Sequence, residues 1–236
     1  MARPDGRAHD ALRAVVLERG ANPYAEGSCL ARFGGTLVHC TASVEPGVPG
    51  FKKGSGEGWV TAEYAMLPRA TQERTPRERN GPGGRSHEIQ RLIGRSLRAA
   101  MGTMGFGEFT IKVDCDVLQA DGGTRTAAIT GACVALADAC AWLAARQGIP
   151  SPFGRLVAAV SVGVVAGEHR LDLAYLEDRD ADVDANLVML EPDRFVEVQG
   201  TGEGGTFSRS DLDALLDLGR LGIGELFRLQ RQALGW

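Results

Sequence analysis

The stretch of sequence that decides the fold is Asp114–Thr126, which reads DCDVLQADGGTRT. Its first part belongs to the run Phe109–Val117, in which every second residue is apolar, as in a strand with one buried face. Two adjacent glycines follow, and from Thr124 small apolar residues continue as far as Ala145. Such a run is typical of a helix that is buried on most sides. The stretch therefore predicts a strand, a tight turn and a core helix.

The turn between this strand and this helix is a candidate anion site. The first backbone N–H groups of a helix lack partners within the helix, the helix dipole is positive there, and Arg125 stands beside them. Gly122 and Gly123 let the backbone approach a ligand, and Thr124 adds a hydroxyl donor. The same spacing also fits an ordinary strand–helix connection with Asp121 or Thr124 as the N-cap and a solvated Arg125. The turn is not a P-loop, because the Gly-Lys-Ser/Thr ending is missing.

On the N-terminal side of this stretch the pattern predicts strands and one further helix. Two β-like runs, Ser28–Phe33 and Thr36–Val44, are joined by two glycines, which predicts a tight hairpin. A third strand is expected at Trp59–Met66. The helix is expected at His87–Met101, with five apolar residues on one face and three arginines on the other. The apolar residues are Ile89, Leu92, Ile93, Leu97 and Ala100, and the arginines are Arg91, Arg95 and Arg98.

On the C-terminal side two strand pairs and a last helix are expected. The first pair is Val157–Val165 with Leu171–Leu176, and the second is Leu187–Leu190 with Phe195–Gln199. Ser208 and Asp211 resemble a capping box that opens a C-terminal amphipathic helix. Strands and helices are thus interspersed with hairpins. We predict an α+β fold with mixed or antiparallel sheets packed with helices, and not a doubly wound parallel sheet.

Length and composition set the class of protein. A chain of 236 residues with 44% hydrophobic residues fits one large domain or two small ones, and we expect a single domain over residues 1–236 because no linker is evident. The longest apolar run, Ala127–Ala145, is interrupted by polar residues and glycine, so we expect a buried helix and no membrane span. The polar N-terminus lacks a secretory signal, which predicts a cytoplasmic location. The five cysteines are an odd number without a Cys-x-x-Cys pair, and we expect them reduced and buried.

Positive charge is concentrated in one part of the chain, although the formal net charge is −4. Eight arginines and three acids lie between Arg69 and Arg98, a local net charge of +5. Arginine binds phosphate oxygens with a fixed, forked geometry, so a focused polyanion site is expected here. The segment from Arg69 to Gly84 has no apolar periodicity, which predicts a mobile surface loop. The arginines of the following helix could form a solvated face or a subunit contact, or they could bind the polyanion, and the pattern does not distinguish these roles.

Negative charge is concentrated near the end of a predicted strand. Six acids lie within residues 172–184, namely Asp172, Glu177, Asp178, Asp180, Asp182 and Asp184. One or two such carboxylates commonly hold Mg²⁺ together with substrate phosphate, whereas a solvated acidic loop is the alternative. An arginine-rich stretch, a phosphate turn and a magnesium site are the parts needed for chemistry on a phosphodiester.

Several longer segments resemble the ribonuclease PH family, in the expected order and over essentially the whole chain. These segments are Trp59–Tyr64, Leu67–Arg69, Gly83–Arg85, Glu88–Ile93, Asp114–Thr126 and Glu197–Thr201. The resemblance implies a ribonuclease PH-type fold, like that of ribosomal protein S5 domain 2. It also implies a homo-oligomer that forms a hexameric ring, a trimer of dimers. The implied activity is phosphorolysis of RNA 3′ ends, chiefly those of tRNA precursors, with inorganic phosphate as co-substrate and Mg²⁺ or Mn²⁺ as cofactor.

The resemblance also implies roles for individual residues. Phosphate binding is assigned to Arg85, Gly123, Thr124 and Arg125, and catalysis to Asp178, Asp184 and Arg125. Asp178 and Asp184 are the implied metal ligands, and Asp184 is also the candidate proton donor to the leaving oxygen. The implied RNA contacts are Arg69, Arg74 and Arg77.

The chain departs from the family pattern at a few positions. Ala174 stands where an acid is expected, and the loop before Gly83 is slightly shortened. Arg179 follows Asp178 where a small residue is usual, and its charge would compete with a metal ion. Two rival functions remain to be distinguished, a non-catalytic RNA-binding ring subunit and a metal-dependent hydrolase that uses water in place of phosphate.

Overall fold

The computed structural model describes residues 3–78 and 81–236. Arg79, one of the eight arginines of the basic stretch, lies outside the described residues. The strands are β1 Val15–Arg19, β2 Gly27–Phe33, β3 Thr36–Pro46, β4 Trp59–Met66, β5 Phe109–Gln119, β6 Val157–Val165, β7 Glu168–Leu171, β8 Val183–Leu190 and β9 Arg194–Thr201. The helices are α1 Gly84–Ala100, α2 Thr124–Gln147, α3 Tyr175–Arg179 and α4 Arg209–Leu234, with a 3₁₀ turn at Gly50–Lys52.

The first sheet has five strands in the order β1-β2-β3-β5-β4. The predicted hairpin is confirmed, because β2 and β3 pair antiparallel with Phe33 opposite Thr36. The strand β4 pairs parallel to β5, since α1 carries the chain back between them. The sheet is therefore mixed, as predicted. The edge strand β1 was not predicted, because its sequence Val-Val-Leu-Glu-Arg does not alternate apolar and polar residues, and its five residues are only half-buried or exposed.

The second sheet has four strands in the order β7-β6-β8-β9, all antiparallel. The prediction of a strand at Leu171–Leu176 was wrong. Ala166 and Gly167 both have positive φ and make a two-residue turn, so β7 begins at once at Glu168. The strand ends before Asp172, whose φ of 54° leaves the extended region, and α3 occupies the remainder.

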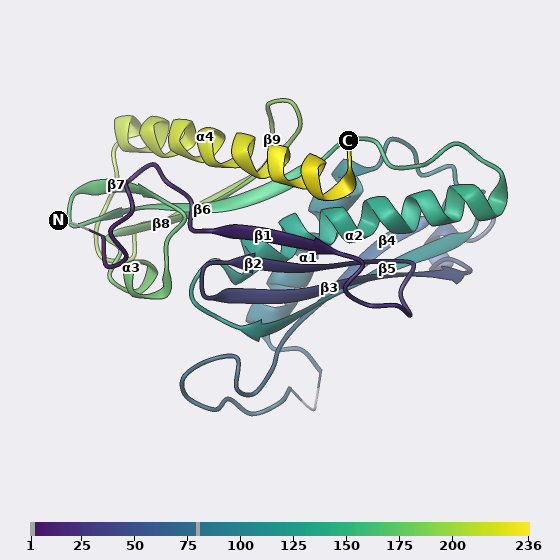
Figure 1. Ribbon diagram of the computed structural model, residues 1–236, viewed down its shortest axis with the longest axis horizontal. Coiled ribbons are helices and arrows are strands. Elements are labelled where there is room, and N and C mark those ends of the chain that lie inside the picture. The colour runs from purple at the N-terminus through teal and green to yellow at the C-terminus, as the bar shows by residue number, and fades with distance from the viewer. Residues whose placement is uncertain (1–2, 79–80) are drawn as a thin grey trace.

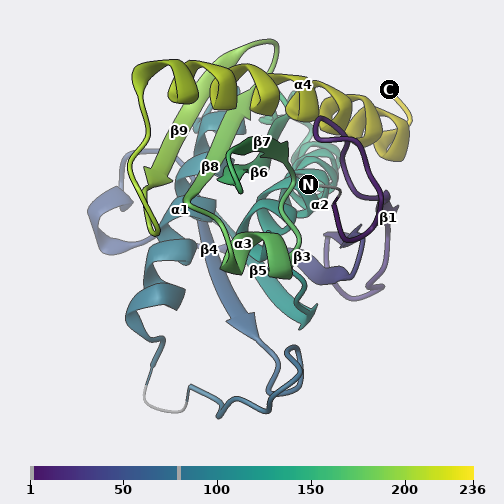
Figure 2. The same ribbon diagram turned by 90° about the vertical axis from the view of Figure 1, so that its left-hand side faces the viewer.

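The long helix α2 lies at the centre of the molecule and contacts strands of both sheets (Figure 1). By length and composition it could cross a membrane, but 78% of its most apolar window is buried inside the fold. It is the core helix that the sequence predicts. One continuous hydrophobic core includes residues of both sheets, α1, α2 and α4. The helix α4 covers the second sheet and β1 (Figure 2), and its predicted capping box at Ser208 and Asp211 is present.

The helix α1 packs its five predicted apolar residues into this core. Arg91 and Arg95 are exposed, as predicted. Arg98 differs, because it is half-buried, donates to the carbonyl of Val60 at 3.0 Å and lies over the ring of Trp59 at 4.7 Å. A long arginine stem can cover apolar surface in this way while its charge stays partly solvated.

The five cysteines are buried and free, as predicted. Burial raises the pKa of Cys29, Cys133 and Cys140 to about 12. At neutral pH these thiols are protonated and pack as small apolar groups.

Candidate active site

A cleft of about 480 Å³ opens where the α2 turn, α1, α3 and β8 meet. It brings together all six residues predicted to bind phosphate and metal, which are Arg85, Gly123, Thr124, Arg125, Asp178 and Asp184. They come from four separate stretches of the chain, so only folding joins them. Its lining also includes Ser161, Tyr175, Arg179, Asn186 and Glu203, of which only Arg179 was singled out from the sequence. Arg69, Arg74 and Arg77 do not line it.

The turn before α2 is built by its two glycines. Gly122 and Gly123 have φ of 74° and 64°, the left-handed region that glycine adopts without strain. A Cβ on Gly122 would lie 2.6 Å from the carbonyl oxygen of Leu173, so the turn packs directly against the chain before α3. The N-cap of α2 is Gly123, and no side chain caps the helix. The alternative with Asp121 or Thr124 as the N-cap is therefore wrong, and the first N–H groups of α2 are left for a ligand.

Arg125 and Thr124 are held by side chains from other elements. The Nη1 of Arg125 donates to Oε1 of Gln199 at 2.8 Å and approaches Oε1 of Glu88 at 3.4 Å. The arginine is therefore fixed and not solvated, with 13% of its side chain exposed. The hydroxyl of Thr124 bonds the hydroxyl of Tyr64 at 2.8 Å. Tyr64 and Gln199 lie in segments that resemble the family, but the sequence alone predicted no role for either.

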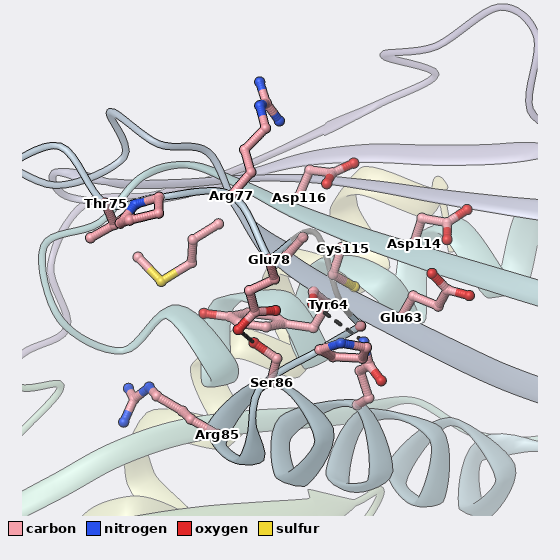
Figure 3. A pocket seen from close by; sticks show the side chains of 16 residues that line it. Glu63, Tyr64, Thr75, Arg77, Glu78, Arg85, Ser86, Asp114, Cys115 and Asp116 are labelled. Carbon is pink, nitrogen blue, oxygen red and sulfur yellow. Dashed lines mark hydrogen bonds between the residues drawn. The ribbon is translucent and has the colours of Figure 1, made fainter.

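Arg85 lies in the first turn of α1, is exposed and forms no hydrogen bond or ion pair within the described residues. Its neighbour Ser86 instead bonds Glu78, whose Oε1 accepts from the Ser86 hydroxyl at 2.9 Å and from the N–H of Gly83 at 3.1 Å. Figure 3 shows the guanidinium of Arg85 pointing away from this pair. A cation without an internal partner, at the edge of the cleft, is available to an anion.

Asp178 and Asp184 face the same cleft from α3 and β8. Burial, together with the charge of Asp178, raises the pKa of Asp184 to about 6, although Arg125 and Arg85 act in the opposite direction. Burial also raises the pKa of Asp178 against the same two arginines. The Oδ1 of Asp184 is buried and has no hydrogen-bond partner in the described part of the chain. Two crowded carboxylates with an unpartnered oxygen suit a divalent cation.

The remaining four acids of residues 172–184 have other roles. Asp172 and Glu177 are buried and bind arginines of the N-terminal segment, Arg13 and Arg3 respectively. Asp180 pairs with Arg179, and Asp182 is exposed. Neither a purely metal-binding cluster nor a solvated loop describes all six, because the fold divides them into two buried ion-pair acids, two cleft acids and two surface acids.

The donor set of the cleft limits how a metal ion could be held. Residues 3–78 and 81–236 contain no group of three His, Cys, Asp or Glu side chains arranged for a metal. Two carboxylates fit Mg²⁺, which commonly takes one or two from the protein and completes its shell with water and substrate phosphate. The guanidinium of Arg179 forks onto Asp180 at 2.7 and 2.9 Å and not onto Asp178.

A second cleft, of about 540 Å³, lies between the arginine-rich loop, the outer face of β4 and β5, and α1 (Figure 3). Arg77 lines it but its side chain extends away from Tyr64 and Ser86 in this view. Arg69, Arg74 and Arg77 are all exposed and have no hydrogen bond or ion pair within the described chain. The two clefts adjoin each other, because Met66 at the end of β4 and Arg85 in α1 line both.

Comparison with known proteins agrees with this architecture. Residues 11–141 match the model of the 3′ exoribonuclease family, domain 1, and residues 155–221 match its domain 2. The chain is similar to ribonuclease PH of Saccharopolyspora erythraea, with 57% identity covering 99% of this chain and 95% of that protein. It is also similar to ribonuclease PH of Mycolicibacterium smegmatis, with 58% identity covering 98% of this chain and 91% of that protein.

Solved structures share the fold at lower identity. Rice Rrp46 superposes with a TM-score of 0.81 at 22% identity, covering 99% of this chain and 100% of that one. A chain of the Archaeoglobus fulgidus exosome with RNA bound to the active site gives a TM-score of 0.80 at 24% identity, covering 96% and 91%. These two likenesses concern the fold alone.

The chain belongs to the 3′ exoribonuclease family, with the ribonuclease PH-type α+β fold that the sequence predicts. Its activity is that of a phosphorolytic 3′–5′ exoribonuclease, a nucleotidyltransferase that uses inorganic phosphate. The two rivals, a non-catalytic ring subunit and a hydrolase, are thereby set aside.

Proposed function

We propose that the cleft between α1, α2, α3 and β8 is the phosphorolysis centre. One observation carries the proposal: two arginines and the N-terminus of α2 lie in one cleft with two carboxylates. Arg85, Arg125 and the N–H groups at Gly123 and Thr124 hold inorganic phosphate. The hydroxyl of Thr124, positioned by Tyr64, adds a further donor.

The reaction brings two anions together. An oxygen of the bound phosphate attacks the phosphorus of the last phosphodiester, and the bond from that phosphorus to the preceding 3′ oxygen breaks. The products are a nucleoside 5′-diphosphate and an RNA with a new 3′-hydroxyl, and the same steps reversed add nucleotides from diphosphates. Arg85 and Arg125 lower the repulsion between the two phosphate groups. Asp184 lines the same cleft and is the candidate proton donor to the leaving 3′ oxygen.

Asp178 and Asp184 are the residues that would hold Mg²⁺ or Mn²⁺. When bound, such an ion supplies positive charge beside the phosphate oxygens at which negative charge increases during transfer. The unpartnered Oδ1 of Asp184 supports this assignment.

The test follows the product of a short single-stranded RNA. Wild-type protein should release nucleoside 5′-diphosphates only when phosphate and a divalent cation are both present. Asp184→Ala should abolish turnover at an unchanged circular dichroism spectrum, whereas Asp182→Ala, an exposed acid of the same segment outside the cleft, should leave turnover unchanged. Undiminished turnover in Asp184→Ala refutes the assignment of the site.

RNA substrates are held by the loop arginines in this proposal. Arg69, Arg74 and Arg77 are exposed, lack internal partners and belong to the segment that borders the cleft at Thr71. They suit the backbone of a structured RNA such as a tRNA precursor. Replacing all three with alanine should weaken processing of a tRNA precursor more than phosphorolysis of a short oligonucleotide, and equal losses would contradict the role.

We further propose that the whole chain acts as one folded unit within a cytoplasmic homo-hexamer, a trimer of dimers. The exposed faces of α1 and of the edge strands β1 and β9 are available for contacts between copies. A solution mass measurement tests ring size, and a monomer at assay concentration contradicts it.

A further inference from the structure

A buried arginine binds the turn Ala120–Thr126, which is proposed to bind phosphate and is called the phosphate turn below. Arg13, 5% exposed, donates from Nη1 to the carbonyl oxygen of Asp121 at 2.5 Å. Its Nη2 also approaches the carbonyl of Gly122 at 3.4 Å. The carbonyl of Gly122 belongs to the same planar peptide group as the N–H of Gly123, and the carbonyl of Asp121 belongs to the peptide group before it. Holding these two carbonyls therefore fixes the direction of the Gly123 N–H, which is proposed to bind phosphate.

A buried threonine holds the same peptide groups from the neighbouring strand. Thr36 is the first residue of β3 and is fully buried. Its hydroxyl donates to the carbonyl of Gly122 at 2.6 Å and accepts from the N–H of Asp121 at 2.9 Å. A single hydroxyl thus satisfies one donor and one acceptor of the turn.

The hairpin before β3 is shaped to admit these contacts. A Cβ on Gly34 would lie 2.8 Å from Cδ of Arg13, and a Cβ on Gly35 would lie 2.6 Å from Oδ2 of Asp121. The two glycines that the sequence marks as a tight turn therefore also leave room for the residues that support the phosphate turn.

Arg13 is itself fixed by a buried carboxylate. Asp172 has no exposed surface and accepts from the backbone N–H, Nε and Nη2 of Arg13, at 2.8, 3.0 and 2.7 Å. Its φ of 54° is unusual for a residue other than glycine, and the surrounding bonds hold it there. Asp121 continues the connection to α3, because its Oδ1 lies 3.4 Å from the N–H of Tyr175.

The turn cannot hold this shape through its own side chains. Gly122 and Gly123 have none, and no side chain caps α2. Glycine also loses the most conformational freedom on folding, so an unsupported Gly-Gly turn would sample many orientations of its N–H groups. Support from Thr36 and Arg13 removes those alternatives before phosphate arrives.

We propose that Thr36 and Arg13 are positioning residues of the phosphorolytic site: Thr36 holds the carbonyl of Gly122, Arg13 holds those of Asp121 and Gly122, and together they direct the N–H of Gly123 toward phosphate. This inference rests on the proposed phosphate site. Neither side chain lines the cleft, so both act through the turn.

The test compares one substitution at two buried threonines. Thr36→Val keeps a β-branched side chain of similar size and removes the hydroxyl. Thr110→Val is the matched control, because Thr110 is also buried in the first sheet and donates to a backbone carbonyl, that of Gly47, at 2.7 Å, but lies outside the cleft. Thr36→Ser restores the hydroxyl. Each variant is assayed with a short RNA at varied phosphate, at a temperature where it is fully folded.

Thr36→Val should raise the KM for phosphate about tenfold. A change of this size corresponds to the loss of about one hydrogen bond to phosphate, because the N–H of the turn is no longer held in the right direction. The KM for RNA should be nearly unchanged, since the loop arginines are not disturbed. Thr36→Ser should return the KM for phosphate to within about threefold of wild type, and Thr110→Val should leave it unchanged. Arg13→Lys, which keeps the charge but cannot reach Asp172 and the carbonyl of Asp121 with a forked group, should also raise it.

Two failures are distinguishable. If wild-type protein turns over RNA without phosphate, the proposed function fails. If wild type needs phosphate but Thr36→Val has the same KM for phosphate as Thr110→Val, the positioning role fails and Thr36 only stabilises the fold.

Discussion

A Cβ at position 122 is the sharpest probe of how the phosphate turn packs. Gly122 has φ of 74°, and a Cβ there would lie 2.6 Å from the carbonyl oxygen of Leu173 and 2.8 Å from the backbone nitrogen of Tyr175. Ordinary contact begins near 3.4 Å, so the chain before α3 must move by about 0.8 Å. Because α3 carries Asp178, that shift displaces a carboxylate of the cleft.

The expected loss of unfolding free energy in Gly122→Ala has two parts, backbone strain and steric overlap. A left-handed conformation costs an alanine about 1 kcal/mol relative to glycine, and overpacking adds about 1–3 kcal/mol. Gly148→Ala is the matched control, because Gly148 has φ of 65° at the other end of α2 and a Cβ there meets nothing within 4 Å. Gly148→Ala should therefore cost about 1 kcal/mol of unfolding free energy and Gly122→Ala about 2–4 kcal/mol.

Urea unfolding measures both stabilities, and phosphate-dependent release of nucleoside diphosphate measures activity. Gly122→Ala should lose about 100-fold or more in kcat/KM, since misplacement by about 1 Å is enough for such a loss, whereas Gly148→Ala should keep wild-type kinetics. Equal destabilisation by the two substitutions, or full activity in Gly122→Ala, would refute this account of the turn.

Three further predictions concern other parts of the molecule. Hydrogen bonds from the hydroxyl and N–H of Ser208 and a contact with His169 hold the pKa of Asp211 below its usual 3.8. The stabilisation of α4 by ionised Asp211 is therefore fully present above about pH 4 and is lost as the pH falls through the lowered pKa. The difference in Tm between wild type and Asp211→Ala should accordingly be largest near neutral pH and narrow below about pH 4; a constant difference contradicts the assignment. With pKa values of about 12, the thiols of Cys29, Cys133 and Cys140 should resist alkylation in the folded protein at pH 8 and react only after unfolding, which mass spectrometry of the labelled chain detects. Inorganic phosphate should raise the Tm of wild type in differential scanning fluorimetry and raise that of Arg125→Gln much less, while equal shifts would place the phosphate elsewhere.

Periodicity and turn chemistry were enough to predict most of the fold. The strand at Trp59–Met66 was predicted with the bounds that the structure shows, and the core helix begins at Thr124 as expected. The helix carries a strong local signal, its long run of small apolar residues, and the strand has an apolar residue at every second position from Val60 to Met66. The region 166–182 carried a weaker signal. The positive φ at Asp172, which ends β7, accompanies bonds to Arg13, 159 positions away, and no local pattern predicts it.

The residues that line the cleft could be predicted from the sequence, but the residues that hold the turn beside it could not. Arg85 and Arg125 stand in segments that resemble the family, and Asp178 and Asp184 stand in the acidic stretch, whereas Arg13 and Thr36 stand in segments that look like an unstructured N-terminus and an ordinary strand. The turn residues that Arg13 and Thr36 bind lie 85 to 109 positions away in the sequence, and no local pattern encodes a bond of that range. Composition alone likewise could not divide the six acids by role. The resemblance singled out Asp178 and Asp184, and only the structure shows that Asp172 and Glu177 are buried in ion pairs with arginines.

The division of those acids supports the proposal that the cleft binds a cation. Glu177 stands next to Asp178 in α3, yet it is 2% exposed and accepts a bidentate pair from Arg3 at 2.8 and 2.7 Å. Its charge is thus neutralised within the fold. Asp178 and Asp184 form no such ion pair within the described residues. Burial raises the pKa of both, and the charge of Asp178 adds to the rise at Asp184, so a divalent ion would lower the cost of ionising them. The N-terminal arginines therefore contact both halves of the proposed centre: Arg3 neutralises Glu177 beside the proposed metal ligands, and Arg13 binds the turn proposed to receive phosphate.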